Sequence, residues 1–103
     1  MSEESSLIYN KALDILSRRE HSAEELIFKL ERKFDSTEEI LLTVSKLKKN
    51  NLLNDFRYAE AYVVARKKKG FGPKKIKFEL LSKGIDESDI HKVLNEEGGW
   101  KKA

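Results

Sequence analysis

Basic side chains gather around a glycine-containing turn in the second half of the chain. The segment from Arg66 to Lys77 reads RKKKGFGPKKIK, which places cations at the end of one expected helix and at the start of the next. Lysine ammonium groups bind phosphate oxygens, and so do the free amides at a helix amino terminus. Lys74 and Lys77 are one helical turn apart, so both side chains can face one anionic strand. These residue types favour the binding of a polyanion through its phosphate groups.

Two further features extend this basic segment. Phe71 lies between two glycines, where it could stack on a nucleic-acid base or fill the turn against the hydrophobic core, and we prefer the second interpretation. Arg18 and Arg19 occupy, in the first half of the chain, the place that Lys68 and Lys69 occupy in the second. We therefore expect two basic spots along one concave side.

The chain offers little for catalysis. His21 and His91 are seventy residues apart, and neither has the spacing of a zinc site or of a nucleophile–base pair. His21 is better interpreted as a turn residue than as a ligand. The pairs Glu24-Glu25 and Glu38-Glu39 fall in first helical turns, where the helix dipole favours negative charge. We expect no catalytic residue, no metal site and no cofactor, and hence no enzyme.

Composition narrows the class of protein. The chain has 103 residues, a net charge of +3 and no cysteine, which favours a reducing compartment. Its start is polar and unlike a signal peptide, and no apolar run approaches the roughly 20 residues of a membrane helix. We expect a cytoplasmic, monomeric protein. Charge is segregated, because residues 56–83 alone carry nine basic and two acidic side chains, and such a face suits a polyanion or an acidic protein.

An internal repeat organises the chain. Residues fifty positions apart match along both halves: Phe28 with Phe78, Leu30 with Leu80, Lys33 with Lys83, and Ile40 with Ile90. A period in this range is typical of stacked supersecondary units. The copies differ in charge, since Glu24-Glu25 of the first become Lys74-Lys75 of the second. We expect Phe28 and Phe78 to pack in the core or between the units rather than to stack on a ligand.

Caps and breakers predict three helices in each copy. In the first copy they begin at Ser5 or Ser6, after Ser22 and after Ser36, and they end near Arg19, Phe34 and Asn50-Asn51. In the second copy they begin at Asn54 or Asp55, at Pro73 and at Asp86, and they end near Lys69, Gly84 and Gly98. No segment alternates with period two, so we predict no sheet.

The predicted fold is therefore all-α, with tandem three-helix repeats of helix-turn-helix-like proportions and an elongated or curved shape. Residues 1–53 form the first repeat with a short lead, 54–97 the second, and 98–103 a tail. Three short helices enclose little apolar area, so we expect one core to continue through both repeats.

Three stretches resemble the RecX family, the bacterial regulators of the RecA recombinase. They are LSRREHSAEEL (16–26), LLNDFRYAEAY (52–62) and KGFGPKKIKFELLSKGI (69–85). The third is the most specific, because a glycine-aromatic-glycine-proline turn followed by basic residues and a glycine-terminated helix is a hallmark of the family. The resemblance extends from about residue 8 to residue 97.

The resemblance implies a non-enzymatic protein that binds RecA and its filament on single-stranded DNA. Such binding limits filament extension, ATP hydrolysis and strand exchange. The residues that it suggests for contact with RecA or DNA are Arg18, Arg19, Arg57, Arg66, Lys67, Lys68, Lys69, Phe71, Lys74, Lys75 and Lys77. The alternatives are an autonomous helical module with weak, electrostatic, sequence-independent affinity for DNA, and a helical adaptor for an acidic protein. Family members commonly have three repeats; Gly98-Gly-Trp100 is either a natural end or the entry to a third.

Overall fold

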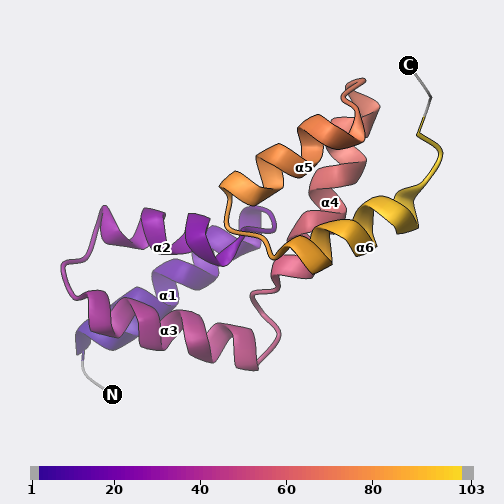
Figure 1. Ribbon diagram of the computed structural model, residues 1–103. Coiled ribbons are helices and arrows are strands. Elements are labelled where there is room, and N and C mark those ends of the chain that lie inside the picture. The colour runs from indigo at the N-terminus through magenta and orange to yellow at the C-terminus, as the bar shows by residue number, and fades with distance from the viewer. Residues whose placement is uncertain (1–2, 101–103) are drawn as a thin grey trace. The chain divides into compact units, whose positions relative to one another are not determined.

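Helices make up the structure, a computed structural model that describes residues 3–100 (Figure 1). In chain order they are α1 (Glu3–Arg18), α2 (Ala23–Glu31), α3 (Thr37–Lys49), α4 (Asp55–Lys68), α5 (Pro73–Ser82) and α6 (Glu87–Glu97). No strand occurs among these described residues, and the predicted all-α class with three helices per repeat is confirmed. Within the same range, no helix is both long and apolar enough to cross a membrane.

The helices form two compact units, which divide between Asn54 and Asp55. In the first unit α1, α2 and α3 pack against one another, and in the second α4, α5 and α6 do the same (Figure 1). Each unit has its own core. Ile8, Leu26, Leu30, Ile40, Leu47 and Leu53 are among the buried side chains of the first, and Tyr58, Val63, Ile76, Leu80, Ile85 and Ile90 among those of the second.

Within each unit, the core also includes apolar side chains from outside the helices. Leu53, which follows α3, is 2% exposed in the first core, and Ile85, between α5 and α6, is 3% exposed in the second. These connector residues close a small core that three short helices alone would leave open.

Some of the predicted N-cap residues form capping hydrogen bonds at the helix starts. Ser22 forms a complete capping box, because its hydroxyl accepts from the Glu25 amide and the Glu25 carboxylate accepts from the Ser22 amide. Ser36 accepts from the Glu39 amide in the same way. The predicted start of the first helix at Ser5 or Ser6 is wrong, because both residues lie inside α1, which already begins at Glu3. Asp86 is the N-cap residue of α6, as predicted, but its carboxylate accepts from the Ser88 hydroxyl and makes no cap hydrogen bond.

Two helices end in the hydrogen-bond pattern that the sequence predicts. At the end of α5 the amide of Ile85 donates to the Leu80 carbonyl and that of Gly84 to Leu81, which is the Schellman pattern. Gly84 has a positive φ of 81° there. The end of α3 repeats the pattern with Asn51 at φ 59°, so the predicted left-handed asparagine is confirmed. The α2 helix ends at Glu31, three residues before the predicted position.

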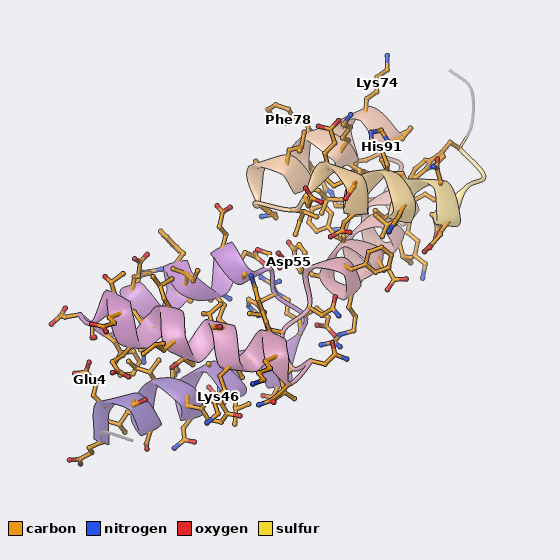
Figure 2. All side chains as sticks on the ribbon, turned by 60° about the horizontal axis from the view of Figure 1, so that its bottom comes forward. Glu4, Lys46, Asp55, Lys74, Phe78 and His91 are labelled. Atoms are coloured by element: carbon orange, nitrogen blue, oxygen red, sulfur yellow. The ribbon has the colours of Figure 1, made fainter. Side chains whose placement is uncertain are left out.

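The expectation that Phe28 and Phe78 pack in a core is wrong for the core of either unit. They are 63% and 73% exposed, and Figure 2 shows Phe78 on the outer side of α5. Each lies two residues after a core residue, Leu26 or Ile76, and two residues in a helix turn the side chain about 200° away. The repeat thus places an aromatic side chain on the solvent face of the second helix of each unit.

The predicted tail lies partly outside the described range, which ends before Lys101–Ala103. Within the range, α6 ends at Glu97 with Gly98 as its C-cap, and the Trp100 indole donates to the Leu94 carbonyl at 3.1 Å. Trp100 also packs against the second core. The first residues after α6 are thus held on their own unit.

Candidate anion-binding surface

The turn between α4 and α5 shapes the basic segment of the second unit. The Phe71 amide donates to the Arg66 carbonyl and the Gly70 amide to Lys67, with Gly70 at φ 94°. This Schellman ending stops α4 and turns the chain sharply. Pro73 then begins α5 as its first residue, as predicted. The cap residue Gly72 has no side chain to accept from the amides of the first turn, so an external oxygen can do so.

Three lysines flank this turn without an anionic partner. Lys68 is the last residue of α4, Lys69 follows it, and Lys74 lies in the first turn of α5. All three are exposed, and no carboxylate among residues 3–100 lies within 4.0 Å of their ammonium groups. Figure 2 shows Lys74 extending away from the ribbon. We call these three side chains the free lysine group.

Lys75 and Lys77 are more constrained. The Lys75 ammonium lies 3.7 Å from a Glu79 carboxylate oxygen, although its side chain is exposed. The Lys77 ammonium lies 3.7 Å from Glu87. Both ion pairs are long and partly solvated, and pairs of this kind contribute little to stability. An anionic ligand could therefore compete for either lysine.

Arg66 and Phe71 belong to a cluster that joins α4 to α5. The Arg66 guanidinium donates to both Glu79 carboxylate oxygens, at 3.0 and 2.8 Å, and the Tyr62 hydroxyl donates to the same carboxylate at 2.9 Å. The guanidinium lies over the Phe71 ring, 3.8 Å from its centroid. Phe71 also packs against the second core, so this geometry favours the interpretation that it fills the turn.

The same contacts control the charge of Glu79. Hydrogen bonds from Arg66 lower the pKa of this carboxyl; desolvation opposes them, and the Tyr62 hydroxyl and the charges of Arg66 and Lys75 lower it further. Glu79 therefore stays ionised and keeps Arg66 engaged. An Arg66 paired in this way is poorly placed to receive a second anion.

Lys67 is also engaged within its unit. Its ammonium donates to the Gly98 carbonyl at 2.7 Å and to Glu97 at 3.3 Å, and it lies 5.2 Å from the centre of the Trp100 ring. It ties the end of α4 to the end of α6. Arg57, the remaining candidate of this unit, is half-buried near the start of α4.

The two candidates of the first unit border a basic pocket. Arg18 lies 3.4 Å from Asp14 and Arg19 lies 3.3 Å from Glu25, and both arginines remain exposed. The pocket beside them has a volume of about 550 Å³ and is also lined by Lys29, Arg32 and Lys33. These three residues were not among the predicted site residues, although their spacing along α2 and just beyond it indicates a basic helix face.

His21 is the least expected member of this region. It is a turn residue, as interpreted, but it is 1% exposed. Its Nδ1 lies 3.0 Å from the Arg19 carbonyl oxygen, and its Nε2 lies 2.7 Å from the Lys29 ammonium nitrogen. A carbonyl only accepts, so Nδ1 carries the proton and Nε2 accepts from Lys29. Burial lowers the pKa of His21, which keeps the ring neutral. Across residues 3–100, no group of three or more His, Cys, Asp or Glu could hold a metal ion.

Comparison with known proteins identifies the family. A family model described as the first three-helix domain of RecX matches residues 9–47, and one described as the second three-helix domain matches residues 54–94. A Regulatory protein RecX of Pseudomonas syringae pv. tomato is 36% identical over 95 residues, which are 91% of this chain and 61% of that relative. One of Legionella pneumophila (strain Corby) is 39% identical over 89 residues, 86% of this chain and 59% of the relative.

Solved structures agree with these sequence matches. A crystal structure of regulatory protein RecX superposes with a TM-score of 0.86 at 29% identity, covering 93% of this chain and 48% of that one. The crystal structure of RecX from Lactobacillus salivarius gives 0.81 at 33% identity, covering 95% and 64%. The chain spans about three fifths of the length of the two curated relatives. Since both RecX three-helix domains match in order and the fold is the same, the chain belongs to the RecX family.

Proposed function

We propose that this chain binds RecA filaments on single-stranded DNA and inhibits their extension, ATP hydrolysis and strand exchange, with no reaction of its own. The observation that supports this most is the presence of both RecX three-helix domains, in order, across residues 9–94. The matched relatives are named regulatory proteins, which supports a non-enzymatic role. A protein with this role acts in the cytoplasm, where RecA works.

The free lysine group is the proposed contact of the second unit. Lys68, Lys69 and Lys74 can bind phosphate or carboxylate oxygens without first breaking an internal ion pair. Arg66 and Lys67, in contrast, would have to leave Glu79 and the end of α6. Of the residues proposed for binding, we therefore assign direct contact to these lysines and to Lys75, and support of the turn to Arg66, Lys67 and Phe71.

Titration into RecA on single-stranded DNA tests the function. We expect the rate of ATP hydrolysis to fall as the chain is added. Inhibition well below one chain per RecA indicates that a few bound molecules block filament growth, whereas inhibition near equimolar amounts indicates binding along the filament. An unchanged rate at saturating chain would contradict the proposal.

Charge reversal tests the contact. We expect the triple substitution K68E/K69E/K74E to weaken inhibition by at least about tenfold, because each lost charge-assisted contact is worth roughly 1 kcal/mol or more. The matched control is K48E/K49E/K92E, which changes three exposed lysines by the same total charge elsewhere on the chain. Equal inhibition by the two triples would show that net charge, and not this surface, is responsible.

A second candidate function is an autonomous DNA-binding module. The unpaired lysines beside an open helix start favour it, since they are residues that contact phosphates and do not read bases. If Lys68, Lys69, Lys74 and Lys75 neutralise about four phosphates of a single strand, the slope of log affinity against log salt is roughly −3. Salt-dependent DNA binding by a chain that leaves RecA unaffected would favour this function over the first.

A further inference from the structure

The first unit has a pocket lined mainly by basic side chains. It has a volume of about 550 Å³, within the range of pockets that hold small ligands. Its cationic lining residues are Lys11, Arg18, Arg19, Lys29, Arg32 and Lys33. One carboxylate, that of Asp14, lies among them, 3.6 Å from the Lys11 ammonium and 3.4 Å from Arg18. The lining therefore keeps a clear excess of positive charge.

Half of these cations are uncompensated. Among residues 3–100, no carboxylate lies within 4.0 Å of Lys29, Arg32 or Lys33. All three come from the last turn of α2 or the residues just after it, so they converge where α2 meets α1 and the loop of His21. Like charges that line one pocket repel one another, and a bound anion would relieve that repulsion.

His21 positions one of these cations. The ring is almost wholly buried and lines the pocket, with Nδ1 bonded to the Arg19 carbonyl. Its neutral Nε2 accepts one hydrogen bond from the Lys29 ammonium, with the two nitrogens 2.7 Å apart. The ammonium has three protons, so two remain for a ligand. A buried neutral acceptor thus fixes the Lys29 charge at the pocket without neutralising it, which a carboxylate in the same place would do.

We propose that this pocket binds phosphate groups. A phosphate group offers three or more acceptor oxygens and up to two negative charges, which match an ammonium and a planar guanidinium better than a single carboxylate does. The phosphates could belong to a free polyphosphate or to the backbone of a nucleic-acid strand. Both present the same oxygens, and the experiment separates them.

Calorimetry with the whole chain, in the absence of RecA, tests the proposal. The probes are pyrophosphate, ATP without magnesium, and a short oligothymidylate. We expect saturable binding of at least one probe and a shift of the His21 ring nitrogen resonances in the NMR spectrum on binding. Tight pyrophosphate or ATP binding identifies a free polyphosphate, and binding of the oligothymidylate alone identifies a strand backbone. Absence of saturable binding by all three overturns the proposal.

Substitution locates the binding. The variant K29Q/R32Q/K33Q removes the three cations that have no carboxylate within 4.0 Å among residues 3–100. It also removes the Lys29–His21 hydrogen bond, so R32Q/K33Q, which keeps that bond, is measured beside it, and circular dichroism verifies that both variants fold. We expect K29Q/R32Q/K33Q to weaken phosphate binding by about tenfold or more. The control K48Q/K49Q/K92Q should bind like the original chain. Equal weakening by K29Q/R32Q/K33Q and by the control contradicts the pocket, because it shows only a general charge effect.

Two further measurements distinguish phosphate binding from the binding of an acidic protein and from the proposed action on RecA. An oligoglutamate peptide that binds as tightly as pyrophosphate, with the same loss in K29Q/R32Q/K33Q, would assign the pocket to an acidic protein partner and overturn the phosphate assignment. The RecA-dependent ATP hydrolysis assay reports on the proposed function separately. A chain that inhibits RecA but binds no phosphate therefore refutes this inference alone.

Discussion

Neighbouring basic residues of the second unit have different partners in the structure. The basic segment 66–77 looks uniform in the sequence, yet its members have three different environments. Arg66 is held by Glu79 and stacked on Phe71, Lys67 holds the end of α6, and Lys74 has no carboxylate within 4.0 Å among residues 3–100. Arg66 and Glu79 are thirteen residues apart on different helices. A contact between residues so far apart is not visible in any local sequence pattern. Only the three-dimensional fold therefore shows which cations are held by an internal carboxylate and which can bind a ligand.

His21 makes stability depend on pH. Burial lowers the pKa of this histidine, the bond from Nδ1 to the Arg19 carbonyl raises it, and the charges of Arg19 and Lys29 lower it while that of Glu25 raises it. The net pKa lies below the usual 6.5. As the pH falls below about 6.5, the unfolded chain takes up a proton that the folded chain resists. Stability should therefore be complete above this pH and should decline below it.

Urea unfolding between pH 7.5 and 5 measures this effect. We expect the free energy of unfolding to fall by no more than about 1.4 kcal/mol per pH unit from this one group. The variant H21N should lose this contribution to the pH dependence. The chain has one other histidine, His91, which is exposed on α6, so H91N should retain it. A pH profile in H21N identical to that of the original chain would show that His21 does not titrate differently on folding.

Secondary-structure elements were the most predictable level of the structure. The boundaries of α2, α3 and α5 depend on residues with local rules, such as Ser22 with Glu25, Asn51, and Pro73 with Gly84. Phe28 and Phe78 were wrongly predicted to pack in a core. The helical periodicity of Leu26 and Leu30 already indicated that Phe28, midway between them, lies on the opposite face of the helix. The start of α1 was less predictable, because the helix already begins at Glu3, before the predicted Ser5 or Ser6.

The turn after α4 gives a prediction at this scale. Gly70 has φ 94°, and a Cβ added there meets nothing within 4 Å, so the only penalty for a side chain is backbone strain. We expect G70A to destabilise the second unit by about 1 kcal/mol. Asparagine tolerates this conformation better, and Asn51 adopts it at the equivalent place after α3. G70N should therefore cost less than G70A in thermal unfolding; equal losses would mean that contacts, and not strain, select glycine.

At the scale of the whole molecule, the repeat predicted the number of units but not how each unit completes its core. The fifty-residue period predicts two equivalent three-helix units, and two RecX domains match it. Helix faces alone do not account for either core. Leu53 and Ile85 lie in connecting segments, where periodicity carries no information, and each completes the core of its own unit.

Separate cores predict that damage stays local. Leu30 and Leu80 are fifty residues apart, at the same place in the repeat, and both are fully buried. Leu30 belongs to the core of the first unit and Leu80 to that of the second, so L30A and L80A should each destabilise one unit by about 2–5 kcal/mol. Amide hydrogen exchange measures this residue by residue. We expect L30A to speed exchange within residues 3–54 and L80A within 55–100, with F28A and F78A as exposed controls that change neither; acceleration of both units by either leucine variant would show that the two cores unfold as one.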